Sequence, residues 1–149
     1  MSRVAWIRIA VIAGAIGLVL GLIAGSGPRW LDGALILVFD ALSSLPMVMF
    51  ALAVITVLGP GIPTLILVIV LVSFPGYARL IRAQTLTLQG ADFVQAERVM
   101  GASHPRILFR HLLPNAMAPA IVLVSFSVAQ AIIVEASLSF LGFGPGAEI

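Results

Sequence analysis

The chain has 149 residues, of which 61% are hydrophobic and 9% charged, and its mean hydropathy is +1.19. Soluble domains are about half apolar and a quarter charged, so these values indicate an integral membrane protein and leave no room for a separate soluble domain. The formal net charge of +2 comes from arginines that lie between apolar segments without interleaved aromatic residues, which argues against nucleic-acid binding. Cysteine is absent, which excludes disulfides and thiolate metal sites.

The first predicted membrane span covers residues 7–25, and its uncharged part from Ile9 to Gly25 gives about 25 Å of helix. Gly17, Gly21 and Gly25 recur every four residues and predict a face on which another helix packs closely. A cleaved signal peptide is the alternative, because Arg3 and Arg8 give the segment a positive start. The length of the apolar run and the spans that follow favour a membrane helix.

The second predicted span covers residues 41–58, after a polar turn at residues 26–33. Asp40 lies at its start, and a carboxylate at the bilayer centre would cost about 2.5–3.5 kcal/mol. We interpret Asp40 as a helix-end or interfacial group, with a transport site as the alternative. Residues 59–63 contain two prolines and two glycines and predict a tight turn.

The third predicted span covers residues 63–80, and Pro75-Gly76 is expected to kink or loosen its last turn. The fourth covers residues 115–136, and Leu138 to Pro145 is interpreted as an exit turn. The sequence therefore predicts an all-α, polytopic membrane helix bundle with about four transmembrane helices.

A polar segment at residues 83–114 separates the last two spans. Five arginines lie in it or just before it, namely Arg79, Arg82, Arg98, Arg106 and Arg110. Burying them at the bilayer centre would cost about 12 kcal/mol or more, so the segment is expected outside the hydrocarbon and, by the positive-inside rule, in the cytoplasm. Met1 would then lie on the outer side, so we expect the chain to be truncated at its start or assembled with a partner that supplies a helix.

Two short helices are predicted in this segment. Asp92 is expected to cap the first, with Gln95 returning the bond, and Gly101 is expected to end it. Ser103 is expected to cap the second helix, and Pro114 to break it where the fourth span begins. Periodicity alone favours an interfacial loop, whereas apolar side chains with basic neighbours favour a docking element.

These residues resemble the EAA loop of ABC importer permeases, whose pattern is E-A-A-x3-G-x9-I-x-L-P. The matching positions are Gln95, Ala96, Glu97, Gly101, His111, Leu113 and Pro114. Gly101-Ala102-Ser103 and Arg110-His111-Leu112-Leu113-Pro114 are similar to the dipeptide, oligopeptide and nickel branch of that family. The resemblance covers roughly Gly21 to Gly144.

The resemblance implies part of a type I ABC importer transmembrane domain in the cytoplasmic (inner) membrane. It implies that the segment Asp92 to Pro114 couples the spans to ATP hydrolysis by cytoplasmic ATP-binding subunits. A second permease subunit and an extracytoplasmic solute-binding protein would complete the importer. The permease itself would carry no catalytic residue, metal or cofactor.

The sequence departs from the pattern at three positions. Gln95 replaces its glutamate, Glu97 replaces its second alanine, and Leu37 stands where a basic residue is expected three positions before Asp40. His111 in place of the pattern's isoleucine is instead a feature of the dipeptide, oligopeptide and nickel branch. Glu97 puts a charge on a surface expected to be small and apolar, so its carboxylate must find a partner or lie at the rim of the docked surface. The family's further spans before Ile9 and after Gly144 are not in the sequence.

Two other classes of function remain. An intramembrane hydrolase is disfavoured because His104 and His111 lie far in sequence from the serines of the last span. A truncated, non-transporting fragment or an assembly partner fits the composition equally well. The sequence leaves open the transported substrate, whether peptide or nickel, and whether the permease pair has like or unlike subunits.

Overall fold

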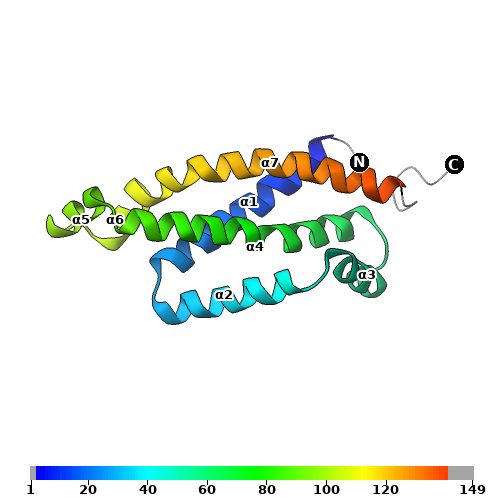
Figure 1. The fold of residues 1–149 in the computed structure, drawn as a ribbon, viewed down its shortest axis with the longest axis horizontal. Coiled ribbons are helices and arrows are strands. Elements are labelled where there is room, and N and C mark those ends of the chain that lie inside the picture. The colour runs from blue at the N-terminus through cyan, green and yellow to red at the C-terminus, as the bar shows by residue number, and fades with distance from the viewer. Residues whose placement is uncertain (1–2, 141–149) are drawn as a thin grey trace.

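The computed structural model describes residues 3–140, and this part of the chain contains helices and no strand (Figure 1). The elements in chain order are α1 (Arg3–Ser26), α2 (Arg29–Ser44), α3 (Met47–Leu58), α4 (Ile62–Gln89), α5 (Asp92–Val99), α6 (His104–Ile107), the π-helix η1 (Leu108–Leu112) and α7 (Leu113–Phe140). The predicted all-α fold is therefore confirmed.

Three helical stretches are long and apolar enough to cross a membrane, namely Trp6–Ser26, Ile62–Gln89 and His104–Gln130. A fourth span would combine α2 and α3, which are bent by 90° at a short break. The long helices lie roughly along one direction, with α5 and α6 together at one end and the start of α1 and the end of α7 at the other (Figure 1).

Close packing of α1 on α4 forms the centre of the bundle. Both helices run in the same direction, because Gly17, Gly21 and Gly25 of α1 face Tyr77, Ile81 and Thr85 of α4 in turn. A Cβ atom on Gly21 would lie 2.6 Å from the Ala78 carbonyl oxygen, and one on Gly25 would lie 2.7 Å from the Thr85 Cβ. Only glycine allows this approach, so the small-residue face of α1 sets the distance between the two helices.

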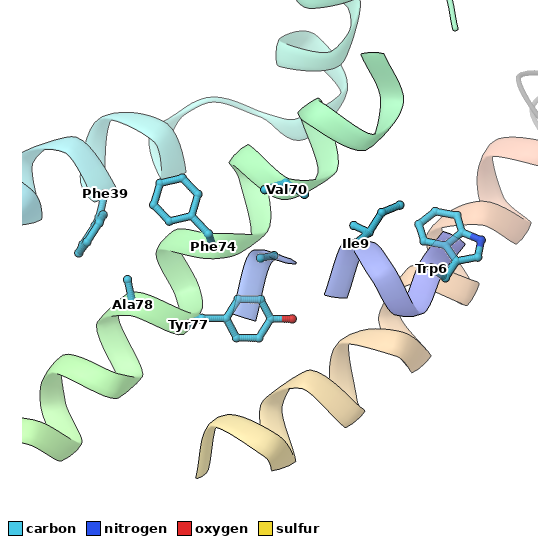
Figure 2. Packing of buried hydrophobic residues seen from close by; sticks show 8 residues of the cluster. Trp6, Ile9, Phe39, Val70, Phe74, Tyr77 and Ala78 are labelled. Carbon is cyan, nitrogen blue, oxygen red and sulfur yellow. The ribbon is translucent and has the colours of Figure 1, made fainter. Parts of the chain in front are cut away.

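Helix α2 runs antiparallel to α4 on another side. Figure 2 shows Phe39 of α2 turned toward Phe74 of α4, and their ring centroids are 6.0 Å apart at an interplanar angle of 81°. Arg82 of α4 donates two hydrogen bonds to Asp32 of α2, at 2.5 and 2.7 Å. Arg79 donates to Asp40 at 2.8 Å. Asp40 lies inside α2 rather than at the end of a helix, and whether it is an interfacial group or part of a transport site stays a prediction.

The second predicted span is not one helix. The turn after α1 is confined to Gly27 and Pro28, and α2 begins at Arg29 rather than after Gly33. The helix expected over residues 41–58 is instead interrupted at Leu45 and Pro46, where the chain bends before α3. The residue before a proline is disfavoured in the helical region, and Leu45 accordingly has an extended ψ of 127°.

Helix α4 continues past the end predicted for the third span. It runs through Pro75 and reaches Gln89, so the polar segment expected from residue 83 begins only at Gly90. Proline removes one helical hydrogen bond, but Pro75 is buried where α4 packs on its neighbours. Packing on α1 and α2 along residues 74–85 therefore outweighs the local cost of the proline.

Pro114 does not interrupt the helix, contrary to the expectation. Residues from His104 to Phe140 form one continuous helical stretch in which η1 joins α6 to α7, and Pro114 is the second residue of α7. Helix α7 also includes Leu138 to Phe140, where an exit turn was expected; residues 141–145 of that turn lie outside the described residues.

Candidate functional site

Helix α5 projects from the end of α4, and local backbone bonds determine where it starts. Ala91 is its N-cap and Asp92 its first residue, so Asp92 is one position too late for the capping role expected of it. Its carboxylate instead lies near the positive end of the helix dipole, which is favourable. The Gln95 amide donates to the Gln89 carbonyl oxygen at 3.1 Å rather than back to the N-cap.

Gly101 ends α5, as the sequence predicts. Its φ is +82°, a conformation in which a Cβ is unfavourable. The Gly101 N–H donates to the Arg98 carbonyl, and the Ala102 N–H donates to the Glu97 carbonyl, both at 3.0 Å. This pair of bonds is the Schellman motif, which satisfies the last carbonyls of a helix and turns the chain sharply.

The second short helix begins after Ser103, which is its N-cap by backbone position, with Pro105 in its first turn. The Ser103 side chain makes no capping bond in the described structure, so that part of the expectation is wrong. The helix then widens into η1, where the Leu113 N–H donates to the carbonyl of Leu108, five residues earlier.

The π-helix explains which side chains face the bundle. Ile107 and Leu112 are five residues apart and both buried, a spacing that the i→i+5 turn brings to one side. The wider turn also lies directly before Pro114, whose missing N–H and bulky ring would disturb an ordinary α-helical turn. The Asn115 side-chain amide donates to the His111 carbonyl oxygen at 2.7 Å in the same region.

A second buried cluster anchors the polar segment to the long helices. It contains Leu22 of α1, Ile81 of α4, Val94 of α5, Ile107, Leu112 and Ala116. Val94 is 0% exposed and is the buried residue of α5. Helix α5 is therefore fixed to the bundle along one side by a single fully buried valine, while Ile107 and Leu112 fix the helix that follows.

Gln89, the last residue of α4, joins three elements, and sequence reasoning missed it. Its amide donates to the Gly25 carbonyl at the end of α1 at 2.7 Å, and its side-chain oxygen accepts from Arg98 of α5 at 3.1 Å. Its backbone carbonyl accepts the bond from Gln95. The signal for this role is weak, because a glutamine before a glycine is also common at any helix end.

The side of α5 opposite Val94 is apolar and exposed. It consists of Phe93, Ala96, Val99 and Met100, which we call the α5 apolar face. Val99 is 88% and Met100 73% exposed, so these side chains are uncovered rather than partly packed. Exposed arginines surround this end of the molecule, namely Arg98, Arg106 and Arg110. A contiguous apolar surface with a charged rim is typical of a protein interaction site.

Glu97 does not lie on the α5 apolar face. Its Oε1 is 3.2 Å from the His111 Nε2 of η1, and both side chains are largely shielded from solvent. The two atoms are close but not aligned as a hydrogen bond, and among the described residues the His111 Nε2 has no hydrogen-bond partner. Of the other predicted loop residues, Ala102 and Leu113 are partly buried and Arg110 is exposed.

The histidines and carboxylates of the described residues are not gathered as a metal site. Across residues 3–140, no group of three or more histidine, aspartate or glutamate side chains is placed to hold a metal ion. His104 is exposed, and His111 is engaged with Glu97 and lies 5.9 Å from the Phe93 ring. The exposed feature of this region is the α5 apolar face.

Comparison with known proteins finds similarity to permeases of transport systems. A family profile described as "binding-protein-dependent transport system inner membrane component" matches residues 17–148. The chain is 36% identical over 133 residues to a dipeptide transport system permease protein of Alkalihalophilus pseudofirmus, covering 89% of this chain and 44% of the relative. It is 42% identical over 134 residues to a putative peptide permease protein of Brucella ovis, covering 90% of this chain and 44% of the relative.

A third relative is a putative peptide transport system permease protein of Brucella suis. It is 40% identical over 141 residues, covering 93% of this chain and 47% of the relative. The chain thus spans less than half the length of the curated relatives that it matches.

Proposed function

The chain belongs to the family of inner membrane components of binding-protein-dependent transport systems, and from this premise we propose that it works as a permease subunit of an ATP-driven peptide importer. Its location is the cytoplasmic membrane, as the family and the apolar helices show. The names of its relatives, which include dipeptide and peptide permeases, support peptides as the transported class.

The α5 apolar face carries the proposal. We propose that it docks into a groove of a cytoplasmic ATP-binding subunit, with the surrounding arginines contacting acidic residues at the groove's rim. A short helix that presents apolar side chains on one side fits such a groove. The glycines and the buried valine that hold α5 are on its other side or at its end, so docking would not disturb the helix's own packing.

Movement of the ATP-binding subunits would then reach the membrane helices by two routes. The first passes through Gln89, which bonds α5 to the end of α1. The second passes through α6 and η1, which continue into α7 without a break. A continuous helix transmits displacement as a rigid body, so the helical path from α6 to α7 supports a direct mechanical connection where a helix break at Pro114 was expected.

We also propose the orientation and the partners that the family implies. The end that carries α5 and α6 would face the cytoplasm, and a second permease subunit and a solute-binding protein would complete the importer. The positive-inside rule supports this orientation, because the exposed arginines of α5, α6 and η1 lie at that end.

Val99→Asp tests the docking proposal. Val99 is 88% exposed, so a carboxylate there should leave the fold intact while placing a charge in the apolar contact. We expect co-purification of the full-length protein with its ATP-binding subunit to fall by about tenfold, which is about 1.4 kcal/mol. Thr87→Asp is the control, because it adds the same charge to an exposed site on α4. Equal losses in both variants would contradict docking through the α5 apolar face.

A further inference from the structure

The ion pair between Arg79 of α4 and Asp40 of α2 is exposed on the surface of the bundle. The Arg79 Nη2 donates to the Asp40 Oδ1 at 2.8 Å and to the Ser43 Oγ at 3.1 Å. The Arg79 side chain is 44% exposed and that of Asp40 is 61% exposed. Gly76, one turn before Arg79, is also exposed, and a Cβ atom built on it meets no atom within 4 Å. These four residues, which we call the Arg79 patch, therefore leave space beside the guanidinium.

The packing of α4 on α1 gives the depth of the Arg79 patch in the membrane. Helix α1 carries no charge over residues 9–25, and Gly17 is the midpoint of that run. A Cβ atom on Gly17 would lie 3.1 Å from the nitrogen of Ala78, and one on Gly21 would lie 2.6 Å from its carbonyl oxygen. Because Ala78 precedes Arg79, the patch lies about 6–12 Å inside the end of the run nearest α5, at 1.5 Å per residue. This level belongs to the part of α1 that crosses the hydrocarbon.

A charged pair exposed at this depth does not fit a lipid-facing surface. Charged side chains are costly in hydrocarbon, and within membranes they face the interior of the protein or a water-filled cavity. The outer side of α1 differs at the same level, where Val19 is 55% exposed between the two glycines. The Arg79 patch therefore marks a side of the bundle that faces something other than lipid.

Helix α2 is held on α4 by other contacts besides this pair. Asp32 and Arg82 make two hydrogen bonds and are shielded, with side chains 20% and 26% exposed. The rings of Phe39 and Phe74 pack between the two helices. The Arg82 carbonyl oxygen lies beside Gly25, so that pair is nearer the end of α1 than the Arg79 patch is. The exposed pair can therefore open while α2 stays on α4.

The Arg79 patch has the chemistry to bind a molecule with one positive and one negative end. In the described part of the chain, both hydrogen bonds of Arg79 come from Nη2, and a guanidinium has further N–H groups in a fork that fits a carboxylate. Asp40 supplies the opposite charge for an ammonium group. A ligand must displace the existing ion pair, so its binding is weak, as the release of a transported solute requires.

We propose that the Arg79 patch lines the water-filled path of the importer and binds the charged ends of the passing peptide, with Arg79 receiving the terminal carboxylate and Asp40 the amino group. The peptide as ligand rests on the proposed function. The exposure of a charged pair at membrane depth does not, and it carries the inference that this side faces water.

Thiol labelling tests whether the Arg79 patch faces water. Ser43→Cys is introduced into the full-length importer in lipid nanodiscs, from which other cysteines have been removed, and treated with a charged, membrane-impermeant thiol reagent. Val19→Cys is the control at the same depth. We expect Ser43→Cys to react at least about tenfold faster, because the reagent does not enter hydrocarbon. Equal, slow labelling of both would mean that lipid or another helix covers the patch, and would overturn the proposal.

Uptake of three alanine tripeptides tests the ligand, using the free peptide, its carboxyl-terminal amide and its N-acetyl form. Arg79→Gln should lower the preference for a free carboxylate about tenfold, the size of a charge-assisted hydrogen bond, and should keep the preference for a free amino group. Asp40→Asn should show the reverse. The solute-binding protein is the same throughout, so its own preferences cancel when each variant is compared with the unmodified importer.

Arg82→Gln is the matched control for the uptake measurement. It breaks the shielded pair and should slow uptake of all three peptides equally, as expected of a residue that only holds α2 on α4. The same uniform loss in Arg79→Gln and Asp40→Asn would overturn the peptide contact. If the unmodified importer takes up none of the three peptides while Ser43→Cys is still labelled rapidly, the proposed peptide transport fails and the water-facing position of the patch stands.

Discussion

Gly101 shows how one residue sets the shape of the candidate site. A Cβ atom built on Gly101 meets no atom within 4 Å, so neighbouring residues leave space for a side chain. Only the backbone conformation of Gly101 limits which residue fits at this position. Its φ of +82° is the reason for glycine, since L residues pay about 1–2 kcal/mol in that region. This local requirement is readable from sequence, which is why the end of α5 could be predicted.

Gly101→Val should therefore loosen the turn without a steric clash. We expect faster hydrogen exchange of the Gly101 and Ala102 amides and a loss of about 1–2 kcal/mol in the local opening free energy. Gly101→Asn is the matched control, because asparagine tolerates positive φ better than other residues. If both variants exchange alike, the backbone conformation of Gly101 is not what holds the turn.

Other residues of the site could not be found from local signals. Gln89 acts through bonds to Gly25 and Arg98, which are 64 and 9 positions away. Asp32 and Arg82 pair across 50 positions. Arg82, which the sequence placed just before a polar segment, therefore lies within α4 and bonds to a carboxylate of α2. Such pairs depend on which helices pack together, and the charge pattern of one sequence does not contain that information.

At the scale of elements, the apolar runs and the spacing of small residues predicted which segments form helices. They predicted less well where those helices begin and end. The continuation of α4 past Pro75 and of the last helix past Pro114 both contradict the usual effect of proline. In each case tertiary packing or a π-turn accommodates the ring. The interruption at Leu45 and Pro46 is the opposite case, because the helix ends there and α3 follows at a bend of 90°.

The contact between α1 and α4 gives a prediction at this scale. Gly21→Ala would place a Cβ 2.6 Å from the Ala78 carbonyl oxygen, so the helices must separate at a cost of about 1–3 kcal/mol. A Cβ atom on Gly33 of α2 would meet no atom within 4 Å. Gly33→Ala should therefore be neutral or stabilising by up to about 1 kcal/mol. Thermal denaturation of the detergent-solubilised protein measures both. A similar midpoint for the two variants would refute the close approach.

At the scale of the whole molecule, the bundle holds one apolar surface away from the long helices. The membrane-spanning helices form one body, and α5 with α6 lies at one end (Figure 1). The α5 apolar face is uncovered there, while Val94 and Gln89 restrain the rest of α5. In the proposed coupling, an ATP-binding partner that docks on this face would move the membrane helices through α5 and α6.

Cross-linking from Met100 tests the central claim most directly. Met100 is 73% exposed on the α5 apolar face, and residues 1–149 contain no cysteine, so Met100→Cys adds the one attachment point within these residues for a photoactivatable cross-linker. In membranes that contain the full-length protein, we predict a cross-link to a cytoplasmic subunit whose peptides include an ATP-binding loop. The cross-link should weaken when Val99→Asp is added. Adducts with lipid alone, or with proteins that bind no ATP, would contradict the account.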